Sequence, residues 1–234
     1  MSTTDQHDAP TAPTGKKGYK GLPLEGFLAR WYAKVTGRNI EDFRKSAEMV
    51  TAQVPPGGSV LEVAPGPGYL AIELARLGNC RVVGLDISRT FVEMATQNAK
   101  NAGVAVTFHH GDAAAMPLDD DAFDFIVCRA AFKNFSRPVQ ALDEMARVLK
   151  PGGRAMIIDL SKDASLADIN DHVHSMQLGL VNAAITKLTF KHMLLKRAYS
   201  REDFNRMAHE SRFGSCEIRV DGIGLEVWLT KTAG

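Results

Sequence analysis

The stretch SVLEVAPGPGYLAIELARL, residues 59–77, decides the fold. Its first five residues are an apolar, β-branched run that predicts a buried strand. Residues 64–68 are rich in glycine and proline and predict a tight loop, and apolar positions at helical spacing over 69–77 predict a helix. A strand that leads through a glycine loop into a helix is the first unit expected of an open α/β sheet.

The remaining sequence repeats this alternation of strand and helix, which requires crossover connections and hence parallel strands. The chain closes with two short strands around the turn Asp221-Gly222, which predict a hairpin. We therefore expect an α/β fold, a Rossmann-like seven-stranded, mostly parallel sheet with an antiparallel last strand and helices on both faces. The expected strands are 59–63, 81–85, 104–109, 123–128, 154–160, 216–220 and 225–230, and the expected helices after residue 77 are 89–102, 138–149 and 201–211.

Five segments are expected along the chain. The first is polar, has no apolar run and predicts a tail rather than a signal peptide. Apolar residues at helical spacing before the first strand predict a cap, and a long helical stretch after the fifth strand predicts a lid. The segments are a disordered tail (1–20), an N-terminal helical cap (21–56), the cofactor-binding Rossmann-like core (57–161), a helical lid or substrate insertion (162–200), and the last helix with the C-terminal hairpin of the core (201–234).

Composition narrows the class of partner. The formal net charge of the 234-residue chain is +1, so charge gives little support to nucleic-acid binding. The three cysteines stand far apart and none belongs to a Cys-x-x-Cys pair, which argues against a disulfide framework or a zinc site. We interpret the cysteines as reduced thiols of a cytoplasmic protein. We expect its partner to be a small molecule, and we expect neither a nucleic acid nor a metal ion to be bound. A monomer and a homodimer both remain open.

The loop after the first strand fits a dinucleotide-binding fingerprint, with Gly66 and Gly68 at its fixed positions, so a nicotinamide enzyme is one candidate. Phosphate binding depends on free backbone N–H groups, however, and Pro65 and Pro67 each remove one. Glu62 would add a negative charge beside the phosphates. The loop therefore favours a cation, and S-adenosylmethionine carries a sulfonium and an ammonium without any phosphate.

Two further carboxylates follow strands. Asp86 ends the second strand, and its two oxygens can accept hydrogen bonds from both hydroxyls of a ribose. Asp112 follows the third strand and can accept from the exocyclic amine of adenine, with Met116 and Leu118 as apolar contacts. Because the carboxyl ends of parallel strands meet at one edge of a sheet, we expect these acids and Glu62 to share a cleft.

Further motifs are Val83-Gly84-Leu85-Asp86, Gly111-Asp112-Ala113, Phe123-Asp124-Phe125 and the specific turn Leu149-Lys150-Pro151-Gly152-Gly153. With the glycine loop, they resemble class I S-adenosylmethionine-dependent methyltransferases over roughly residues 40–160. Lys133-Asn134-Phe135 resembles the ubiquinone/menaquinone C-methyltransferase branch of that class. The resemblance implies S-adenosylmethionine as cofactor and S-adenosylhomocysteine as product. The residues expected to hold the cofactor are Glu62, Ala64, Pro65, Gly66, Gly68, Tyr69, Asp86, Ile87, Asp112, Ala113 and Arg129.

The chain departs from the family pattern at two places. Ala64 stands where the family has its first loop glycine. No Asn/Asp-Pro-Pro-aromatic motif follows the fourth strand, where Cys128-Arg129-Ala130-Ala131 stands instead. Family members that methylate amino groups of nucleic-acid bases usually carry that motif, so the resemblance implies methyl transfer to a small, apolar or aromatic organic acceptor. The acceptor atom, carbon, oxygen, nitrogen or sulfur, remains open.

The sequence does not single out a catalytic residue. Displacement at a sulfonium has a neutral leaving group, so positioning and exclusion of water can supply much of the acceleration, and a base is needed only for an un-ionised acceptor. His172 and His174 are two positions apart and make a poor metal pair on a helix. The candidates near the expected cleft are Arg129, Lys133, Asn134, Asp159, His172, His174, Tyr199 and Tyr32.

The expected lid is basic, because residues 172–201 contain five lysines and arginines and no acid. A solvated helix face explains this better than a membrane contact, so we expect no stable membrane insertion, while peripheral contact remains open. Two other functions remain open as well. The chain could bind S-adenosylmethionine without methyl transfer, as a binding module or as a catalyst of rearrangement or decarboxylation, or it could be an NAD-dependent oxidoreductase.

Overall fold

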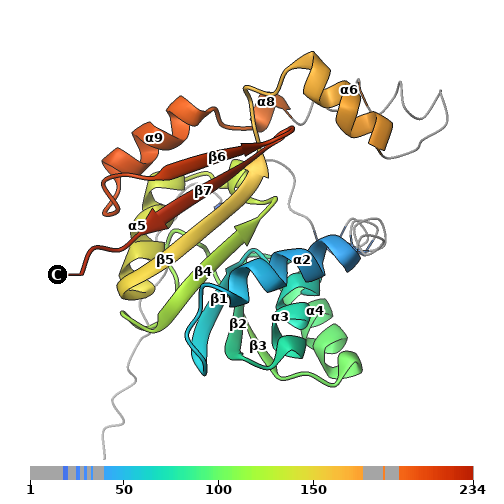
Figure 1. Cartoon of the computed structure of the whole chain (residues 1–234). Helices are drawn as coiled ribbons and strands as arrows, with labels where there is room; N and C mark the ends of the chain where they lie inside the picture. The colour runs from blue at the N-terminus through green and yellow to red at the C-terminus, as the bar shows by residue number, and fades with distance from the viewer. Residues whose placement is uncertain are drawn as a thin grey trace, which may run out of the picture.

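The computed structural model describes residues 18–20, 25, 26, 29, 30, 33, 40–175, 187 and 195–233. These residues form one seven-stranded sheet in the order β3-β2-β1-β4-β5-β7-β6, drawn in Figure 1. Strands β1 to β5 run parallel, and β7 runs antiparallel to both of its neighbours, as expected. The strands are β1 (Gly58–Val63), β2 (Cys80–Asp86), β3 (Val106–His110), β4 (Phe123–Arg129), β5 (Leu149–Leu160), β6 (Glu217–Asp221) and β7 (Gly224–Thr230).

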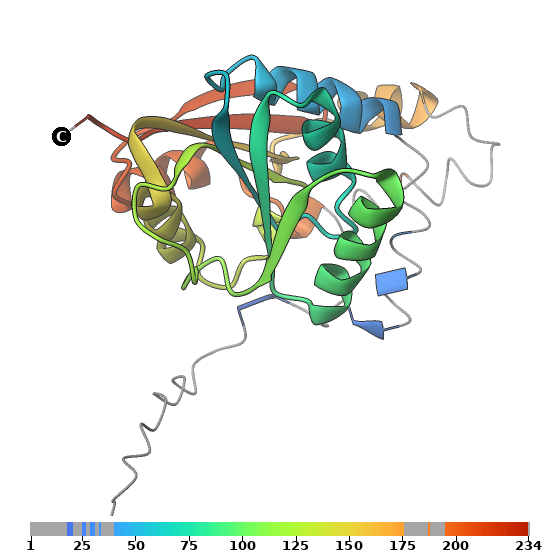
Figure 2. The same ribbon diagram turned by 90° about the horizontal axis from the view of Figure 1, so that it is seen from below.

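Helices cover both faces of the sheet, as Figure 1 and Figure 2 show from two directions. On one face lie α2 (Ile40–Thr51), α3 (Tyr69–Leu77) and α4 (Arg89–Ala102), and on the other lie α5 (Pro138–Val148) and α9 (Arg201–Glu210). Alternate residues of each strand serve the two faces: Val60 packs in the cluster under α2 and α3, and Leu61 packs in the cluster under α5 and α9. The remaining short elements are η1 (Phe132–Asn134), α6 (Leu166–Ser175) and α8 (Leu195–Arg197).

Helix ends are capped where the chain turns back from the sheet. Ser88 caps α4 by accepting a hydrogen bond from the backbone N–H of Phe91 at 3.2 Å. Ser200 and Asp203 form a reciprocal capping box at the start of α9. Gly68 precedes α3 with φ of 82°, a left-handed conformation that glycine adopts without strain. These caps fix the turns at the carboxyl-end edge of the sheet.

The largest departure from the predicted strand bounds is at β5, and the other strands begin and end within two residues of the predictions. β5 begins at Leu149, five residues before the predicted start, because Leu149 already pairs with Phe123 of β4. The register then shifts, and Arg154 pairs with Phe125. The Pro-Gly-Gly turn therefore lies within the strand as an irregularity rather than before it.

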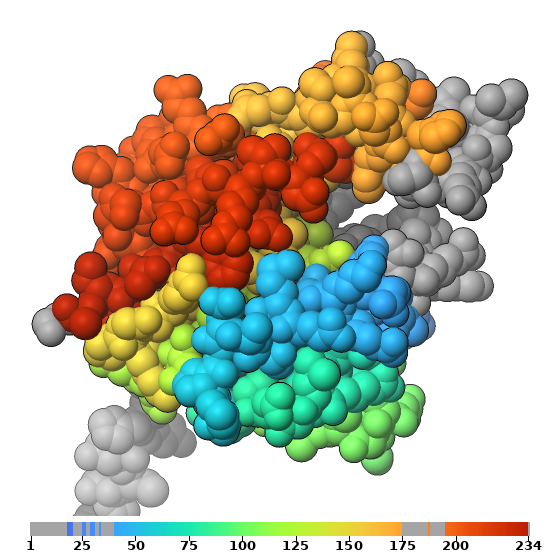
Figure 3. All heavy atoms as spheres, in the orientation of Figure 1, coloured from blue at the N-terminus to red at the C-terminus, as the bar shows by residue number. Residues whose placement is uncertain are grey.

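The expected tail and lid are described only in part. Residues 18–20, the last of the expected tail, are held against the loop after β4, where Tyr19 forms a β-bridge with Phe135. Residues 1–17 lie outside the described residues, as do 176–186 and 188–194 of the expected lid. The described part of the lid packs Ile169, Val173 and Leu195 against Ile223 beyond β6. Figure 3 shows the surface hollowed between α2 and α6, at the edge where the parallel strands end.

The three cysteines are unpaired, and burial raises the pKa of the Cys128 thiol well above its usual value. Among the described residues, no group of histidines, cysteines and acids lies close enough to hold a metal ion. In the same part of the chain, no helix has the length and apolar character needed to cross a bilayer.

Gly84 in the middle of β2 gives a test of this packing. A Cβ atom there would stand 2.5 Å from Cδ1 of Phe108 and 3.1 Å from Cγ of Pro65. We expect Gly84→Ala to lower the free energy of unfolding by about 1–3 kcal/mol, measured by urea denaturation, because the core must move to admit a methyl group. Gly224→Ala is the control, since its nearest contact would be 3.3 Å. Equal losses in the two variants would contradict this packing.

Candidate active site

The loop after β1 is a compact turn built from left-handed residues. Gly66 has φ of 55° and Ala64 has φ of 59°. The backbone N–H of Gly68 donates to the carbonyl of Pro65 at 3.0 Å, which closes the turn. Ala64 donates its N–H to the carbonyl of Leu85 in β2 at 2.8 Å. Ala64, which stands where the family has glycine, therefore has the left-handed backbone that glycine adopts most easily. For alanine this conformation costs about 1 kcal/mol.

Asp86 joins this loop to the next strand. Its Oδ2 accepts a hydrogen bond from the N–H of Gly66 at 3.0 Å, and its Oδ1 accepts from the N–H of Ser88 at 2.8 Å. Burial nevertheless raises the pKa of the Asp86 carboxyl to about 6, since only 5% of the residue is exposed. Each carboxylate oxygen has a second acceptor site, so both can still accept a hydroxyl of a ribose.

Glu62 lies in β1, one residue from the strand's end, and is 3% exposed. Burial raises the pKa of its carboxyl to about 8, although a backbone hydrogen bond from Ala71 and the positive charge of Arg129 act in the other direction. Its Oε2 is buried and has no hydrogen-bond partner among the described residues. A buried acceptor without a donor is costly unless something else supplies one.

These observations test whether the residues fit S-adenosylmethionine. The orphaned Oε2 of Glu62 offers a site for a cation, and the ammonium and sulfonium of the molecule are cationic. Asp86 offers two oriented oxygens for a diol. Asp86 would suit the ribose of either S-adenosylmethionine or NAD, whereas an ionised Glu62 beside the loop would repel a diphosphate. The loop and its two acids therefore fit the nucleoside cation, and Glu62 favours it over NAD.

Asp112 is more heavily engaged than the sequence suggests. Its Oδ2 accepts from a guanidinium nitrogen of Arg137 at 2.7 Å, and its Oδ1 accepts from the N–H of Ala114 at 2.9 Å. Gly18 stands so close that a Cβ there would lie 2.3 Å from Oδ2. Beside it, Ile87 is 37% exposed and contacts the same glycine. The expected adenine side of the cleft therefore has the N-terminal segment as its wall, and Ala113 lies partly buried against the core there.

Arg129 and Tyr69 are held by the helix before β1. The guanidinium carbon of Arg129 lies 4.7 Å from the ring centroid of Phe43 in α2, a cation–π contact. The ring of Tyr69 lies 5.6 Å from the same phenylalanine, and its hydroxyl donates to the carbonyl of Ala33 at 3.0 Å. Residues of the expected helical cap thus pack over the candidate cofactor loop.

Lys133 and Asp159, two separate catalytic candidates, form one buried ion pair. Nζ of Lys133 lies 2.7 Å from Oδ1 of Asp159, and the side chains are 10% and 2% exposed. The same ammonium donates to the carbonyl of Ala130 at 2.6 Å, and the N–H of Lys133 donates to Oδ2 of Asp159 at 2.9 Å. Because these groups satisfy one another, the pair fixes the loop after β4 against β5 and leaves neither charge free for an acceptor.

The remaining candidates lie further along the edge. The Asn134 carbonyl accepts from the N–H of Lys20 at 2.7 Å, and Nζ of Lys20 donates to the Tyr199 hydroxyl at 2.5 Å. His172 and His174 both lie on α6, the first half-buried and the second exposed. Tyr32 lies outside the described residues.

Four residues at this edge were missed by the sequence reasoning. Phe43 stacks on Arg129, Arg137 pairs with Asp112, Gly18 lies against Asp112, and Lys20 donates to Tyr199. Phe43 belonged to a predicted helix, but nothing in the pattern marks its partner. Gly18 and Lys20 lie in a polar segment that composition assigns to a tail, so no local signal could have found them.

Glu62→Gln tests how much the buried carboxyl of Glu62 destabilises the folded, unliganded protein. Because the folded pKa lies near 8 and the unfolded pKa near 4.5, the folded state holds an extra proton between these values. Stability of the unliganded protein therefore falls as pH rises through this window, by up to about 1.4 kcal/mol per pH unit. We expect the difference in unfolding free energy between Glu62→Gln and the unsubstituted protein to shift in favour of the variant from pH 5 to pH 8. A difference that is constant with pH would show that Glu62 is not buried as a carboxylic acid.

Asp159→Asn tests the buried pair. It leaves the ammonium of Lys133 buried without its counter-ion, so we expect a loss of about 3–5 kcal/mol in chemical denaturation. Asp121→Asn is the matched control, because Asp121 is 54% exposed in its ion pair with Lys231 and should lose less than about 1 kcal/mol. Similar losses in the two variants would contradict the burial of the pair.

Comparisons with known proteins agree with this geometry. A model of the methyltransferase domain matches residues 61–157, which hold the loop, Asp86, Asp112 and β4. The chain is 36% identical over 189 residues to a demethylmenaquinone methyltransferase of Deinococcus radiodurans, covering 78% of this chain and 73% of that protein. It is 38% identical over 109 residues to a ubiquinone/menaquinone biosynthesis C-methyltransferase, UbiE, of Bdellovibrio bacteriovorus, over 45% of this chain and 46% of that relative.

The fold has a close counterpart among solved structures. A crystal structure from Methanococcus maripaludis, assigned to the S-adenosylmethionine-dependent methyltransferases, superposes with a TM-score of 0.73 and 21% identity and covers 96% of this chain and 99% of that one. At this identity the likeness shows the fold alone, and the sequence relationship carries the family. The chain belongs to the class I S-adenosylmethionine-dependent methyltransferases, in the part of that family that resembles the ubiquinone/menaquinone C-methyltransferases.

Proposed function

We propose that this methyltransferase transfers the methyl group of S-adenosylmethionine to a small aromatic acceptor of the quinol type. The observation that carries the proposal is the orphaned, buried Oε2 of Glu62 beside a loop fixed by Asp86. The names of the relatives, which act on demethylmenaquinone or in ubiquinone and menaquinone biosynthesis, support the class of acceptor. We place the enzyme in the cytoplasm, without stable membrane insertion.

We assign the predicted cofactor-binding residues to different parts of S-adenosylmethionine. Glu62 as a carboxylate attracts the cationic methionine end, and Asp86 accepts the ribose hydroxyls. Asp112, already paired with Arg137, contributes one free lone pair to the adenine amine. The other residues supply backbone and walls: Ala64, Pro65, Gly66, Gly68, Tyr69, Ile87, Ala113 and Arg129.

Bound S-adenosylmethionine supplies a methyl group on a sulfonium, ready for in-line displacement. The protein contributes mainly by positioning the acceptor and excluding water from the reaction, and less by acid–base chemistry. The loop after β4 is rigid because Lys133 and Asp159 lock it to β5, so it can present a fixed floor to the acceptor. The half-buried ring of Tyr199 gives that floor an apolar side, and the fully buried ring of Phe132 supports it from behind at a centroid distance of 6.0 Å.

Tyr199 is the described candidate best placed to meet an acceptor. It forms a β-bridge to Ser161 at the end of β5, beside the edge where the parallel strands end. Its hydroxyl accepts from Lys20, so its own hydrogen is left to donate to an acceptor oxygen. We assign it the orientation of the acceptor rather than proton removal.

Cofactor affinity tests the site. Asp86→Ala should weaken S-adenosylmethionine binding by about 1–3 kcal/mol in isothermal titration, because hydrogen bonds to a charged acceptor are lost. Glu93→Ala, an exposed acid on α4, is the control and should bind as the unsubstituted protein does. Unchanged affinity in Asp86→Ala, or preferential binding of NAD by the unsubstituted protein, would overturn the assignment.

Turnover tests the reaction. With a short-chain demethylmenaquinol as acceptor, we expect S-adenosylhomocysteine and a methylated product in equal amounts, with the methylated atom identified by mass spectrometry and NMR. Tyr199→Phe should raise KM for the acceptor while leaving the affinity for S-adenosylmethionine unchanged. Tight cofactor binding without S-adenosylhomocysteine across quinols, phenols and aromatic acids would favour the alternative of binding without methyl transfer.

A further inference from the structure

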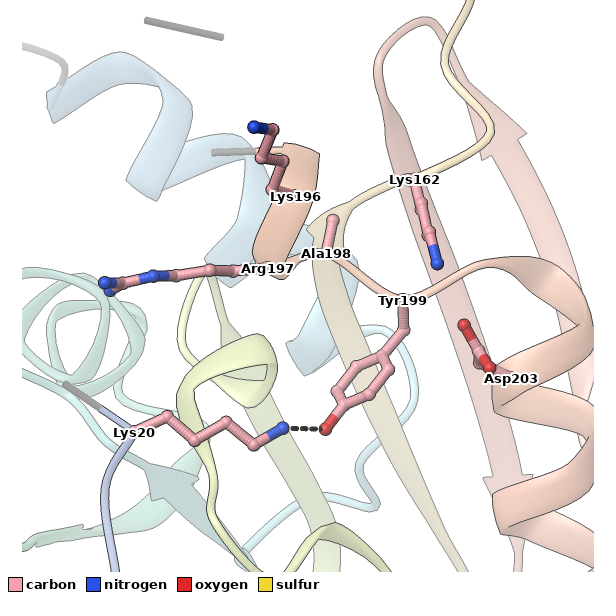
Figure 4. A pocket seen from close by; sticks show the side chains of 7 residues that line it. All are labelled: Lys20, Lys162, Lys196, Arg197, Ala198, Tyr199 and Asp203. Carbon is pink, nitrogen blue, oxygen red and sulfur yellow. Dashed lines mark hydrogen bonds between the residues drawn. The ribbon is translucent and has the colours of Figure 1, made fainter. Parts of the chain in front are cut away.

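A cavity of about 420 Å³ opens beyond the end of β5, between the N-terminal segment, α8 and α9. Figure 4 shows Lys20 and Lys162 on either side of Tyr199, while Arg197 and Lys196 extend outward from α8. We call this cavity the basic pocket. Its side-chain lining consists of Lys20, Lys162, Lys196, Arg197, Tyr199 and Asp203, together with the small Ala198.

The positive charge of the basic pocket is not balanced within it. Asp203 is already used, because its Oδ1 accepts from Arg206 at 2.7 Å and its Oδ2 accepts from the N–H and hydroxyl of Ser200. Among the described residues, no carboxylate forms an ion pair with Lys20, Lys162, Lys196 or Arg197. Four cations around one small volume repel one another, and an anion bound between them would relieve that repulsion.

The basic pocket adjoins the candidate active site. Lys20 follows Gly18 by two residues, at most about 7 Å of chain, and Gly18 stands against Asp112 at the cofactor edge. Tyr199 contacts both Lys20 and the ring of Phe132, which lies directly after β4. Tyr199 is therefore shared by the basic pocket and the proposed acceptor site, and the exposed side chains of Lys196 and Arg197 of α8 also line the pocket.

We propose that the basic pocket binds an anionic substituent, a carboxylate or a phosphate, on the methyl acceptor. This inference rests on the proposed function and deepens it: the preferred acceptor is a quinol-type aromatic molecule that also carries a carboxylate or a phosphate. Its ring lies against Tyr199, and its oxyanion lies against the ammonium of Lys162, while Lys20 on the other side of the tyrosine ring adds longer-range attraction and Arg197 lies toward solvent. Ammonium and guanidinium groups are the side chains that bind such oxyanions most strongly.

The test is binding of small anionic aromatics to the full chain in the presence of S-adenosylhomocysteine. Phenyl phosphate and benzoate are the charged probes, and benzamide is the uncharged match to benzoate. We expect saturable binding of at least one charged probe by isothermal titration, weakened by added salt, and none of benzamide. Benzamide binding as tightly as benzoate, or no binding of either charged probe, would overturn the proposal.

Charge removal locates the anion. Lys162→Gln should weaken binding of the charged probe by roughly tenfold, and Lys20→Gln with Lys162→Gln together should weaken it further. Lys100→Gln is the matched control, because this exposed lysine lies in the last turn of α4, at the opposite edge of the sheet. Equal binding by Lys162→Gln and Lys100→Gln would overturn the proposal.

Two further measurements separate the causes of a failure. Titration of S-adenosylmethionine into the unsubstituted protein and each variant shows whether the cofactor site is intact. If the unsubstituted protein does not bind S-adenosylmethionine, the proposed function is wrong. If it binds S-adenosylmethionine but no charged probe, only the proposal for the basic pocket is wrong. Sedimentation with vesicles of phosphatidylglycerol tests a lipid surface as the source of the anion. Vesicle binding that depends on Lys162, in a protein that ignores phenyl phosphate, would overturn the acceptor subsite in favour of a membrane contact.

Discussion

The site is organised around the Asp86 carboxylate, which receives one backbone N–H from the loop after β1 and another from the start of α4. These two hydrogen bonds tie together segments that follow neighbouring strands, so the left-handed turn at Gly66 is held in one conformation. Because the carboxylate uses one acceptor site on each oxygen for the protein, the remaining two sites are oriented before any ligand arrives. A preorganised acceptor loses less freedom on binding than a mobile one.

Glu62 shows the cost of such a site. An acid buried without a donor on one oxygen is unfavourable for the fold, and its raised pKa expresses that cost. The surrounding core can tolerate it, because the strands on both sides of β1 are covered by large apolar clusters. Local sacrifice of stability at a ligand site is common in enzymes. In the proposed cofactor site, this acid would be a water-excluded acceptor for a positive charge, where attraction is stronger than in water.

The sequence predicted what depends on local pattern and missed what depends on distant contacts. The strands, the glycine loop and the acids at the strand ends follow from periodicity, turn chemistry and the rule that parallel strands end at one edge. The contact between Lys20 and Tyr199 joins residues 179 positions apart, and the pair of Asp112 and Arg137 joins residues 25 apart, so neither leaves a local trace. Lys133 and Asp159 were two catalytic candidates by sequence; only their 2.7 Å separation shows that they neutralise each other.

The central claim is that the buried acid beside the loop exists to meet a cation, and proton release on binding tests it most directly. Isothermal titration of S-adenosylmethionine at pH 6.5, in buffers of different ionisation enthalpy, counts the protons that leave the protein. Since the Glu62 carboxyl has a pKa of about 8 when unliganded, a cation that demands its ionised form should expel about one proton more from the unsubstituted protein than from Glu62→Gln, in which only Asp86, with a pKa of about 6, can contribute a fraction of a proton. Binding with no proton release, or with the same release in Glu62→Gln, would contradict the account.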